Sequence, residues 1–206
     1  REIESMSLSD FYVKGILNPG VDGYFYTLGR SPIAQFNGFA EYMVLPRSLS
    51  KFVYGRFRYP EENIWISPQG TRTALHFDAV ENLNLQIDGS KDFYLFPPRI
   101  KDMSPYPWYS QAAYVSDIDP RNNPTPTQFP IDTGIHVELH AGQMLYLPYG
   151  WWHQVDTTGS TNMNANFWWF PRTKLLTYPR QTFRGAAVLA NRMGQHPHKR
   201  AEKLKR

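Results

Sequence analysis

Two histidines and an aspartate have the types and spacing of a metal site. His76 and Asp78 stand two residues apart, so on a strand both side chains project from the same face. His153 ends the segment 142–153, which we expect to be a strand that runs into a tight turn beside two tryptophans. Two histidines and one carboxylate with open coordination positions are typical of non-haem iron(II) oxygenases. We therefore expect these three residues to hold an iron ion.

Each of these residues also has an ordinary structural explanation. A His-x-Asp triplet often arises by chance, and His76 or His153 alone is explained more simply as a hydrogen-bonded histidine of the core. We interpret His136 and His140 in that structural way and Glu81 as a solvated loop acid. Only the combination with further residues distinguishes a metal site from this alternative.

Lys91 is one such further residue. It follows His76 by fifteen positions, and a lysine that points into a barrel is costly unless it meets an anion. The distal carboxylate of 2-oxoglutarate is such an anion, and the hydroxyl of Thr73 could hydrogen-bond to the same carboxylate. The alternative is that Lys91 lies at the tip of a hairpin and faces water, and the spacing alone does not separate the two.

Short strands are the elements that must position these residues. The 17 prolines and 14 glycines indicate many turns, and the hydrophobic pattern predicts about eight strands followed by a C-terminal helix. Residues 83–87 and 92–96, joined by Asp88 and Gly89, have the pattern of a β-hairpin. The polar segment 99–134 predicts a long surface loop. The expected fold class is mostly β with flanking helices, a sandwich or barrel with strands at residues 23–28, 63–67, 73–78, 83–87, 92–96, 135–139, 144–148 and 163–169.

The composition excludes several classes of protein. The 206 residues, 41% apolar and 16% aromatic, suffice for one folded domain. The absence of cysteine excludes disulfides, zinc-thiolate sites, iron–sulfur clusters and cysteine nucleophiles. No apolar stretch approaches the roughly 18 residues that span a bilayer, and no signal-peptide pattern opens the chain. We expect no membrane partner and an intracellular location, cytoplasmic or nuclear.

Charge is distributed unevenly along the chain. Residues 172–206 contain ten Lys or Arg and one acid, a net charge of +9, which leaves −5 on residues 1–171 out of the total of +4. Such a tail is most often a solvated end, but it is also a candidate contact for nucleic acid. We divide the chain into a catalytic domain, residues 1–172, and a C-terminal helix with a basic tail, residues 173–206. Because the chain begins at Arg1 without a methionine, we expect further residues before it.

The surroundings of the three candidate ligands resemble those of the cupin-like JmjC-domain oxygenases. Residues 76–98 carry His-Phe-Asp, then Asn82, and end in Gln-Ile-Asp-Gly-Ser-Lys-Asp-Phe-Tyr-Leu-Phe-Pro-Pro. Residues 142–153 read Gly-Gln-Met-Leu-Tyr-Leu-Pro-Tyr-Gly-Trp-Trp-His, and Asn-Phe-Trp follows at 166–168. The similarity covers roughly residues 62–170. Within the family, these motifs most resemble the asparaginyl hydroxylases that inhibit hypoxia-inducible factor.

The resemblance implies a fold, an activity and a set of site residues. The fold is a double-stranded β-helix, or jelly roll, and the activity is that of an iron(II)- and 2-oxoglutarate-dependent dioxygenase that uses O2 and releases succinate and CO2. The implied iron ligands are His76, Asp78 and His153. The residues implied for the 2-oxoglutarate pocket are Lys91, Thr73, Asn82, Asn166, Trp168 and, on an early strand, Tyr26 with Tyr24 as its alternative. We also expect an apolar lining that keeps the site dry, formed by Leu75, Phe77, Leu85, Phe93, Trp152 and Trp168.

Several functions are compatible with this resemblance. Hydroxylation of a protein or peptide side chain is the leading one, N-methyl-lysine demethylation uses the same chemistry, and the basic tail keeps a tRNA-modifying oxygenase open. From a different class, the chain could be an inactive cupin that serves as a binding module, although no expected ligand is missing. The C-terminal helices of the family's hydroxylases also imply a homodimer through the helix expected at residues 173–195.

Overall fold

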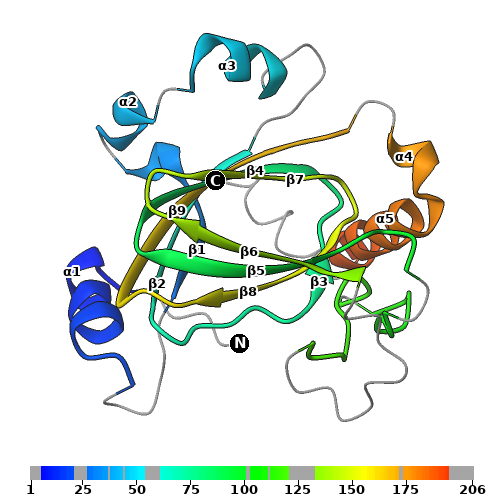
Figure 1. Cartoon of the computed structure of the whole chain (residues 1–206), viewed down its shortest axis with the longest axis horizontal. Helices are drawn as coiled ribbons and strands as arrows, with labels where there is room; N and C mark the ends of the chain where they lie inside the picture. Colours follow the sequence, from blue (N-terminus) through cyan, green and yellow to red (C-terminus); the bar gives the residue numbers. More distant parts are fainter. Residues whose placement is uncertain are drawn as a thin grey trace, which may run out of the picture.

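A double-layered β-structure with peripheral helices forms the centre of the molecule (Figure 1). The computed structural model describes residues 6–20, 27–36, 38–43, 45–53, 61–100, 103–110, 112–120, 133–171 and 174–194. The strands are β1 (Leu28–Pro32), β2 (Glu61–Pro68), β3 (His76–Phe77), β4 (Glu81–Asp88), β5 (Ser90–Phe96), β6 (Ile135–His140), β7 (Met144–Leu147), β8 (Trp152–Thr157) and β9 (Thr161–Trp169). The helices are α1 (Leu8–Phe11), a π-helix (Tyr12–Leu17), a 3-10 turn (Ile33–Gln35), α2 (Phe39–Tyr42), α3 (Arg47–Val53), α4 (Lys174–Thr177) and α5 (Pro179–Gly194).

The described strands form two antiparallel sheets. The larger has the order β1-β2-β9-β4-β7 and the smaller the order β3-β8-β5-β6. Side chains from the two sheets meet between them: the Ser67 and Thr157 hydroxyls lie 3.2 Å apart, and Leu147 of β7 packs with Phe93 and Leu139 of the smaller sheet. This arrangement confirms the predicted jelly-roll fold class.

The predicted hairpin of residues 83–87 and 92–96 is wrong. β4 pairs with β7 and β9 of the larger sheet, whereas β5 pairs with β6 and β8 of the smaller one. Gly89 lies between them with a φ of 72°, and a Cβ there would come within 2.0 Å of the Thr161 backbone oxygen. Only glycine tolerates both the conformation and this close approach. The turn therefore passes the chain from one sheet to the other, which places Lys91 on the strand beside β8.

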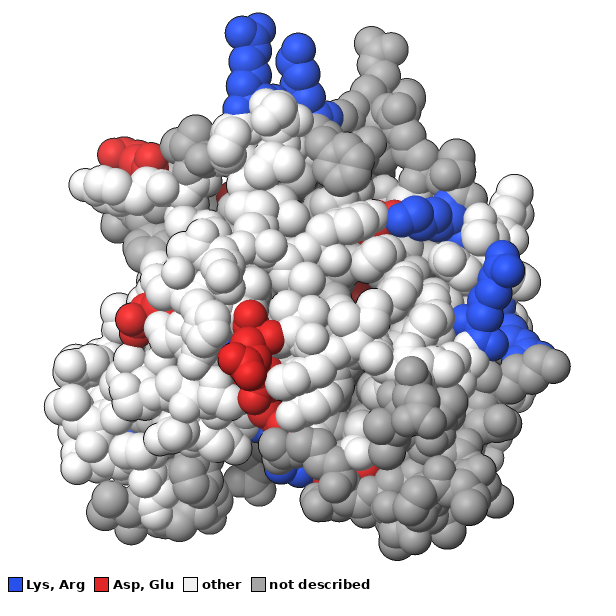
Figure 2. Space-filling model, in the orientation of Figure 1, with Lys and Arg blue, Asp and Glu red and all other residues white. Residues whose placement is uncertain are grey.

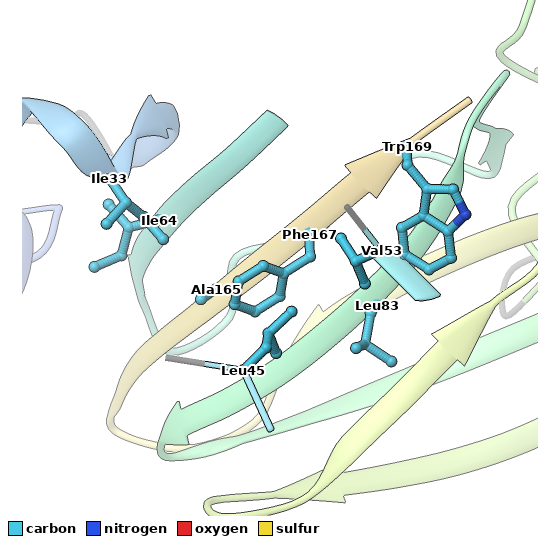
Figure 3. Close-up of a cluster of buried hydrophobic side chains, with 8 residues drawn as sticks. All are labelled: Ile33, Leu45, Val53, Ile64, Leu83, Ala165, Phe167 and Trp169. Carbon is cyan, nitrogen blue, oxygen red and sulfur yellow. The ribbon is translucent and has the colours of Figure 1, made fainter. Parts of the chain in front are cut away.

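The outer face of the larger sheet is covered by the segment that contains α2 and α3. Alternate residues of β2, β4 and β9 point outward and form an apolar surface. Residues from the preceding segment pack on it and close a buried cluster (Figure 3) of Ile33, Leu45, Val53, Ile64, Leu83, Ala165, Phe167 and Trp169. Because the apolar face of this sheet is turned outward, its other face, toward the smaller sheet, is free to carry polar side chains.

The segment between β5 and β6 was expected to be a surface loop, and that expectation is wrong for part of it. Met103, Ala113 and Ser116 are buried. The Ser116 N–H donates to the Leu75 carbonyl over 2.8 Å, so this part of the segment lies along β3 like an added edge strand. It packs against Leu75, Phe77, Phe96 and Trp152. The outer face of the smaller sheet is therefore covered beside β3.

Two helices replace the single one expected over residues 173–195. α4 ends at Thr177, and α5 begins at Pro179, since proline suits a first helical position but interrupts a helix interior. The Gln181 amide donates to the Pro98 carbonyl over 2.7 Å, and a Cβ at Gly185 would lie 2.7 Å from that of Ala79. α5 thus packs directly against the link between β3 and β4. Within the described residues, no helix is long and apolar enough to cross a membrane.

Candidate metal centre

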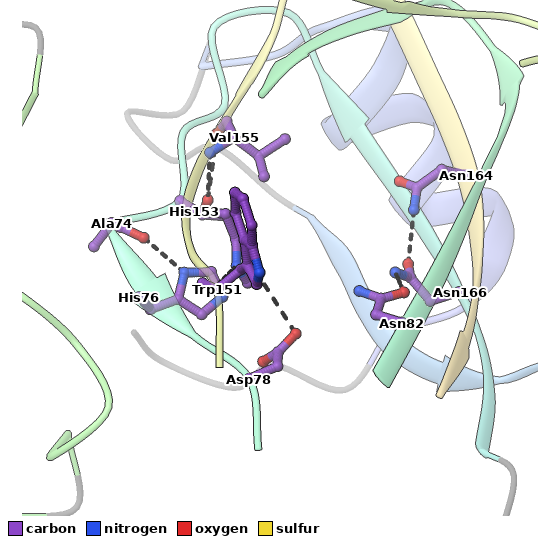
Figure 4. Close-up of polar contacts among 10 residues, drawn as sticks. Ala74, His76, Asp78, Asn82, Trp151, His153, Val155, Asn164 and Asn166 are labelled. Atoms are coloured by element: carbon purple, nitrogen blue, oxygen red, sulfur yellow. Dashed lines mark hydrogen bonds and ion pairs between the residues drawn. The ribbon is translucent and has the colours of Figure 1, made fainter. Parts of the chain in front are cut away.

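His76, Asp78 and His153 come together between the two sheets (Figure 4). β3 pairs with β8 in the register that places His76 opposite His153, and their ring centroids are 4.2 Å apart. Asp78 follows β3 directly, and its Oδ2 lies 3.7 Å from the His153 Nε2. One ligand atom from each residue lies within 4.8 Å of the others. The three side chains predicted as ligands therefore have a geometry that one ion could bridge.

Backbone carbonyls hold both imidazole rings in the orientation that a ligand needs. The Nδ1 of His76 lies 2.8 Å from the Ala74 carbonyl oxygen, and the Nδ1 of His153 lies 3.0 Å from that of Trp151. A carbonyl oxygen can only accept, so each Nδ1 carries the proton and donates. Each Nε2 then keeps a lone pair, and metal-bound histidines commonly donate their other ring nitrogen to a backbone carbonyl in this way.

The protonation of His153 agrees with this arrangement. Burial first, and then the neighbouring His76, lower the pKa of His153 to about 4, while Asp78 acts in the opposite direction. The ring is therefore neutral at physiological pH. A neutral imidazole is the form that binds metals.

Lys91 points into the same interior from β5. Its side chain is buried, which excludes the alternative that it faces water at a hairpin tip. Burial lowers the pKa of Lys91 from 10.5 to about 7. Lys91 thus lies in the interior, as binding of 2-oxoglutarate would require. That it binds 2-oxoglutarate stays a prediction.

A chain of side-chain amides leads from Lys91 toward the three candidate ligands. The Lys91 ammonium donates to the Asn164 Oδ1. The Asn164 Nδ2 donates to the Asn166 Oδ1 over 2.8 Å, and the Asn166 Nδ2 donates to the Asn82 Oδ1, also over 2.8 Å. Figure 4 shows these amides opposite Asp78 and His153, on the strands of the larger sheet.

The other residues predicted for the site differ in how the structure places them. The Thr73 hydroxyl is engaged with the backbone of Val155, whose N–H donates to it over 2.9 Å. Trp168 has the same strand face as the inward amides and packs at 6.4 Å against Trp65. The predicted roles of Thr73 and Trp168 in co-substrate binding stay predictions. Tyr26 and Tyr24 lie outside the described residues.

The expected dry lining is wrong for four of its six residues. Leu75, Phe77 and Trp152 face away from the interior into the cluster beside β3, and Leu85 packs on the outer face of the larger sheet. Phe93 was expected in the lining and does form the apolar part of the interior, together with Leu95, Leu139, Leu147 and their neighbours. Side chains alternate between the two faces of a strand, so residues adjacent to a ligand in sequence point away from it.

Several polar residues of the interior were not predicted. Asn164, Asn63 and Asn84 are buried and share a face with Asn166, and both polar atoms of the Asn63 side chain are without a partner among the described residues. The sequence does carry a pattern that marks this polar face, because residues 162, 164 and 166 are all asparagine. In an antiparallel strand such alternation usually marks a solvated face, whereas here the polar face is the buried one.

Glu81 was interpreted as a solvated loop acid, and this is wrong. It begins β4, is 4% exposed, and accepts from the Tyr146 hydroxyl over 2.6 Å. It also accepts from the Tyr149 N–H over 3.0 Å and pairs with the Lys174 ammonium at 3.0 Å. These bonds tie β4, β7 and α4 together, which gives Glu81 a structural role.

A second group of possible metal ligands lies on the outer face of the smaller sheet. Asp92, His136 and Glu138 also have ligand atoms within 4.8 Å of one another. The side chains of His136 and His140 are 47% and 59% exposed, so neither is a core histidine. Acidic side chains gather over β5 and β6 in Figure 2.

Comparison with known proteins gives matches over the same region. The cupin-like domain family matches residues 4–174. Lysine-specific demethylase JMJ31 of Arabidopsis thaliana is 31% identical over 113 residues, 52% of this chain and 20% of that protein. Lysine-specific demethylase JMJ30 of the same plant is 33% identical over 110 residues, 52% of this chain and 25% of that protein. HSPB1-associated protein 1 of Bos taurus is 27% identical over 157 residues, 71% of this chain and 32% of that protein. The chain thus spans about a third or less of the length of these relatives.

Proposed function

The chain belongs to the cupin-like domain family, and we propose that it is an iron(II)- and 2-oxoglutarate-dependent dioxygenase that hydroxylates a protein or peptide side chain. The observation that carries the proposal is the cluster of His76, Asp78 and His153, with ligand atoms within 4.8 Å of one another. Two histidines and one carboxylate leave coordination positions open for a co-substrate and oxygen.

The donor set fits iron(II). Both imidazoles keep a lone pair on Nε2 because their Nδ1 atoms face backbone carbonyls. The chain has no cysteine, and a site of imidazole and carboxylate without thiolate does not select soft ions. When bound, iron and 2-oxoglutarate supply the oxidising chemistry, in which O2 is reduced while the oxo acid loses CO2 and becomes succinate.

The residues of this chain bind, orient and exclude water. The buried Lys91 ammonium suits a carboxylate at one end of the co-substrate, because a buried cation is stabilised by an anion that meets it. Buried amide atoms that have no partner among the described residues, such as those of Asn63, offer hydrogen bonds to a polar molecule held between the sheets. The apolar side chains around Phe93 and Leu139 keep water from that interior.

Demethylation of N-methyl-lysine is the second candidate, and it uses the same site. The observation in its favour is that relatives over half of this chain bear the name lysine-specific demethylase. A hydroxylase leaves oxygen on its product, whereas a demethylase releases formaldehyde after hydroxylation of the methyl group. Mass spectrometry of reacted peptides therefore separates the two: a gain of one oxygen supports hydroxylation, and loss of a methyl group supports demethylation.

The direct test is succinate formation from 2-oxoglutarate with added iron(II), with and without candidate peptides. We expect the wild type to form succinate, Asp78→Ala to form none, and Asp92→Ala of the outer cluster to behave as the wild type. Circular dichroism of each variant confirms folding. A folded wild type that makes no succinate and binds no 2-oxoglutarate would overturn the proposal and favour a binding module.

A further inference from the structure

Lys91 and Asn82 lie on different sheets but are joined by two amides. Lys91 belongs to β5 of the smaller sheet, whereas Asn82, Asn164 and Asn166 belong to β4 and β9 of the larger one. The bond from Lys91 to Asn164 therefore crosses the interior between the sheets. All four side chains are buried, so water competes little for these bonds.

The lysine sets the direction of every bond in the chain. Lys91 Nζ donates to the Asn164 Oδ1, so Asn164 turns its carbonyl oxygen toward Lys91 and its nitrogen toward Asn166. Asn166 must then accept with its oxygen and donate with its nitrogen. The Asn82 oxygen is the last acceptor in this series of bonds. The N–H groups of the Asn82 side chain therefore form its end. Figure 4 shows the Asn82 nitrogen on the side that faces Asp78.

We propose that Asn164 is a positioning residue that joins the two ends of the co-substrate site. It holds the Lys91 ammonium and, through Asn166, fixes Asn82 so that N–H donors rather than a carbonyl face the candidate metal ligands. The ligand this suits has oxygen acceptors at both ends, as a 2-oxo dicarboxylic acid does. The inference rests on the proposed function for the identity of that acid, but the directed amide chain exists without it.

The first test follows the amide chain in the protein without metal or co-substrate. Side-chain NH2 signals of Asn82 and Asn166 are assigned by nuclear magnetic resonance from the signals lost in Asn82→Asp and Asn166→Asp. We expect Asn164→Leu and Lys91→Met to shift or broaden the Asn82 signals, although neither residue touches Asn82. Asn164→Asp keeps an acceptor for Lys91 but has no N–H for Asn166, so it should change the Asn82 signals in the same way. It serves as the test variant if Asn164→Leu does not fold.

A matched control is available on the same strand. Asn162 is buried, points to the same side of β9, and donates to the Ser90 carbonyl over 2.9 Å instead of joining the chain. Asn162→Leu should therefore leave the Asn82 signals unchanged. Asn82 signals that stay unchanged in folded Asn164→Leu and Asn164→Asp would overturn the proposal.

The second test measures the dissociation constant of 2-oxoglutarate by calorimetry, with manganese(II) in place of iron. We expect Asn164→Leu and Asn82→Leu each to weaken binding by about tenfold, as for loss of a hydrogen bond to a charged group. Because both break one chain, the double variant should bind about as weakly as the weaker single variant. Losses that multiply would overturn the coupling. A wild type that binds no 2-oxoglutarate would instead contradict the proposed function. The nuclear magnetic resonance test would still show whether Asn164 positions Asn82.

Discussion

The two faces of the smaller sheet each carry histidine and carboxylate side chains close enough to share an ion, yet they differ in what surrounds them. On the inner face, backbone carbonyls fix both imidazoles, and His153 is buried. On the outer face, His136 is held by Tyr94, which stacks on it at 4.8 Å, and by Asp92, 3.3 Å from its Nε2. That face is open to water, which competes for an ion. Ligand spacing alone therefore does not distinguish a metal centre, whereas burial and a fixed tautomer do.

Neighbouring residues of β5 show how sharply the environment changes between the faces. Lys91 points inward, and burial lowers its pKa to about 7. Asp92 points outward into an exposed cluster with His136. The two positions are adjacent in sequence, so the pleat of the strand alone separates the buried interior that contains Lys91 from the exposed, acidic outer surface.

The largest expected difference between the faces is in metal affinity. His76→Ala removes an inner ligand and should weaken manganese(II) binding by at least about 100-fold, because loss of a group that only hydrogen-bonds to a ligand already costs about 10- to 100-fold. His136→Ala of the outer cluster should change it by less than about twofold, since exposed pairs contribute little. Isothermal calorimetry measures both. Equal losses in the two variants would mean that the faces do not differ in the way proposed.

A smaller effect is expected where the outer face buries an acid. Asp156 is 5% exposed, and the Arg72 Nε lies 3.1 Å from its Oδ1. Arg72→Met should lower the free energy of unfolding at pH 7 by about 2 kcal/mol, less than for a fully buried pair because Arg72 is partly exposed. Burial raises the pKa of Asp156, and Arg72 acts against that rise. The loss should therefore shrink as the pH falls and Asp156 takes up a proton.

The control for that variant removes the other carboxylate partner of Arg72. Asp119, 2.8 Å away, is 35% exposed. Asp119→Asn should cost less than about 0.5 kcal/mol by urea denaturation. If Arg72→Met costs no more than Asp119→Asn, or costs the same at pH 4 as at pH 7, the buried carboxylate does not depend on Arg72.

The last expected effect is the pH dependence of stability that Lys91 causes, which is small at each step but extends over several pH units. Its pKa is about 7 in the folded protein against 10.5 ordinarily, so between these values the unfolded chain binds more protons. Stability therefore rises with pH in this window. Relative to Lys91→Met, the wild type should gain roughly 1 kcal/mol per pH unit from pH 7 to pH 10 without co-substrate.

Lys174 provides the comparison for that titration. Burial acts to lower the pKa of Lys174, but Tyr146 and Glu81, with which the ammonium pairs, raise it overall. A group with a raised pKa loses its contribution only as the pH passes its unfolded value, so Lys174→Met should show no such slope between pH 7 and pH 10. If the free energy of unfolding changes with pH in the same way in the wild type and in Lys91→Met, the pKa of Lys91 is not lowered by burial.

The candidate ligands could be predicted because their chemistry is local. His76 and Asp78 needed only strand alternation to share a face, and the motif around His153 supplied the third ligand. The strand that carries His153 was not predicted, since the sequence there was interpreted as a turn after a strand. β8 nevertheless places His153 opposite His76.

Features set by tertiary context could not be predicted. The turn at Gly89 has the pattern of a hairpin, and only the close approach of Thr161 shows that it changes sheets. Asn164 belongs to a strand whose alternation fits a solvated polar face equally well. Which face of an alternating strand is buried depends on what packs on the other side, and here the segment around α3 covers the apolar one.

The pairing of residue 76 with residue 153 also has a consequence for folding kinetics. Bringing together strands so far apart in sequence requires closing a long loop, which is slow compared with forming a local turn. The three ligand side chains cannot meet until β3 has found β8. An ion bound by all three would therefore report completion of the jelly roll, and would slow unfolding more than it speeds folding if β3 and β8 pair after the rate-limiting step.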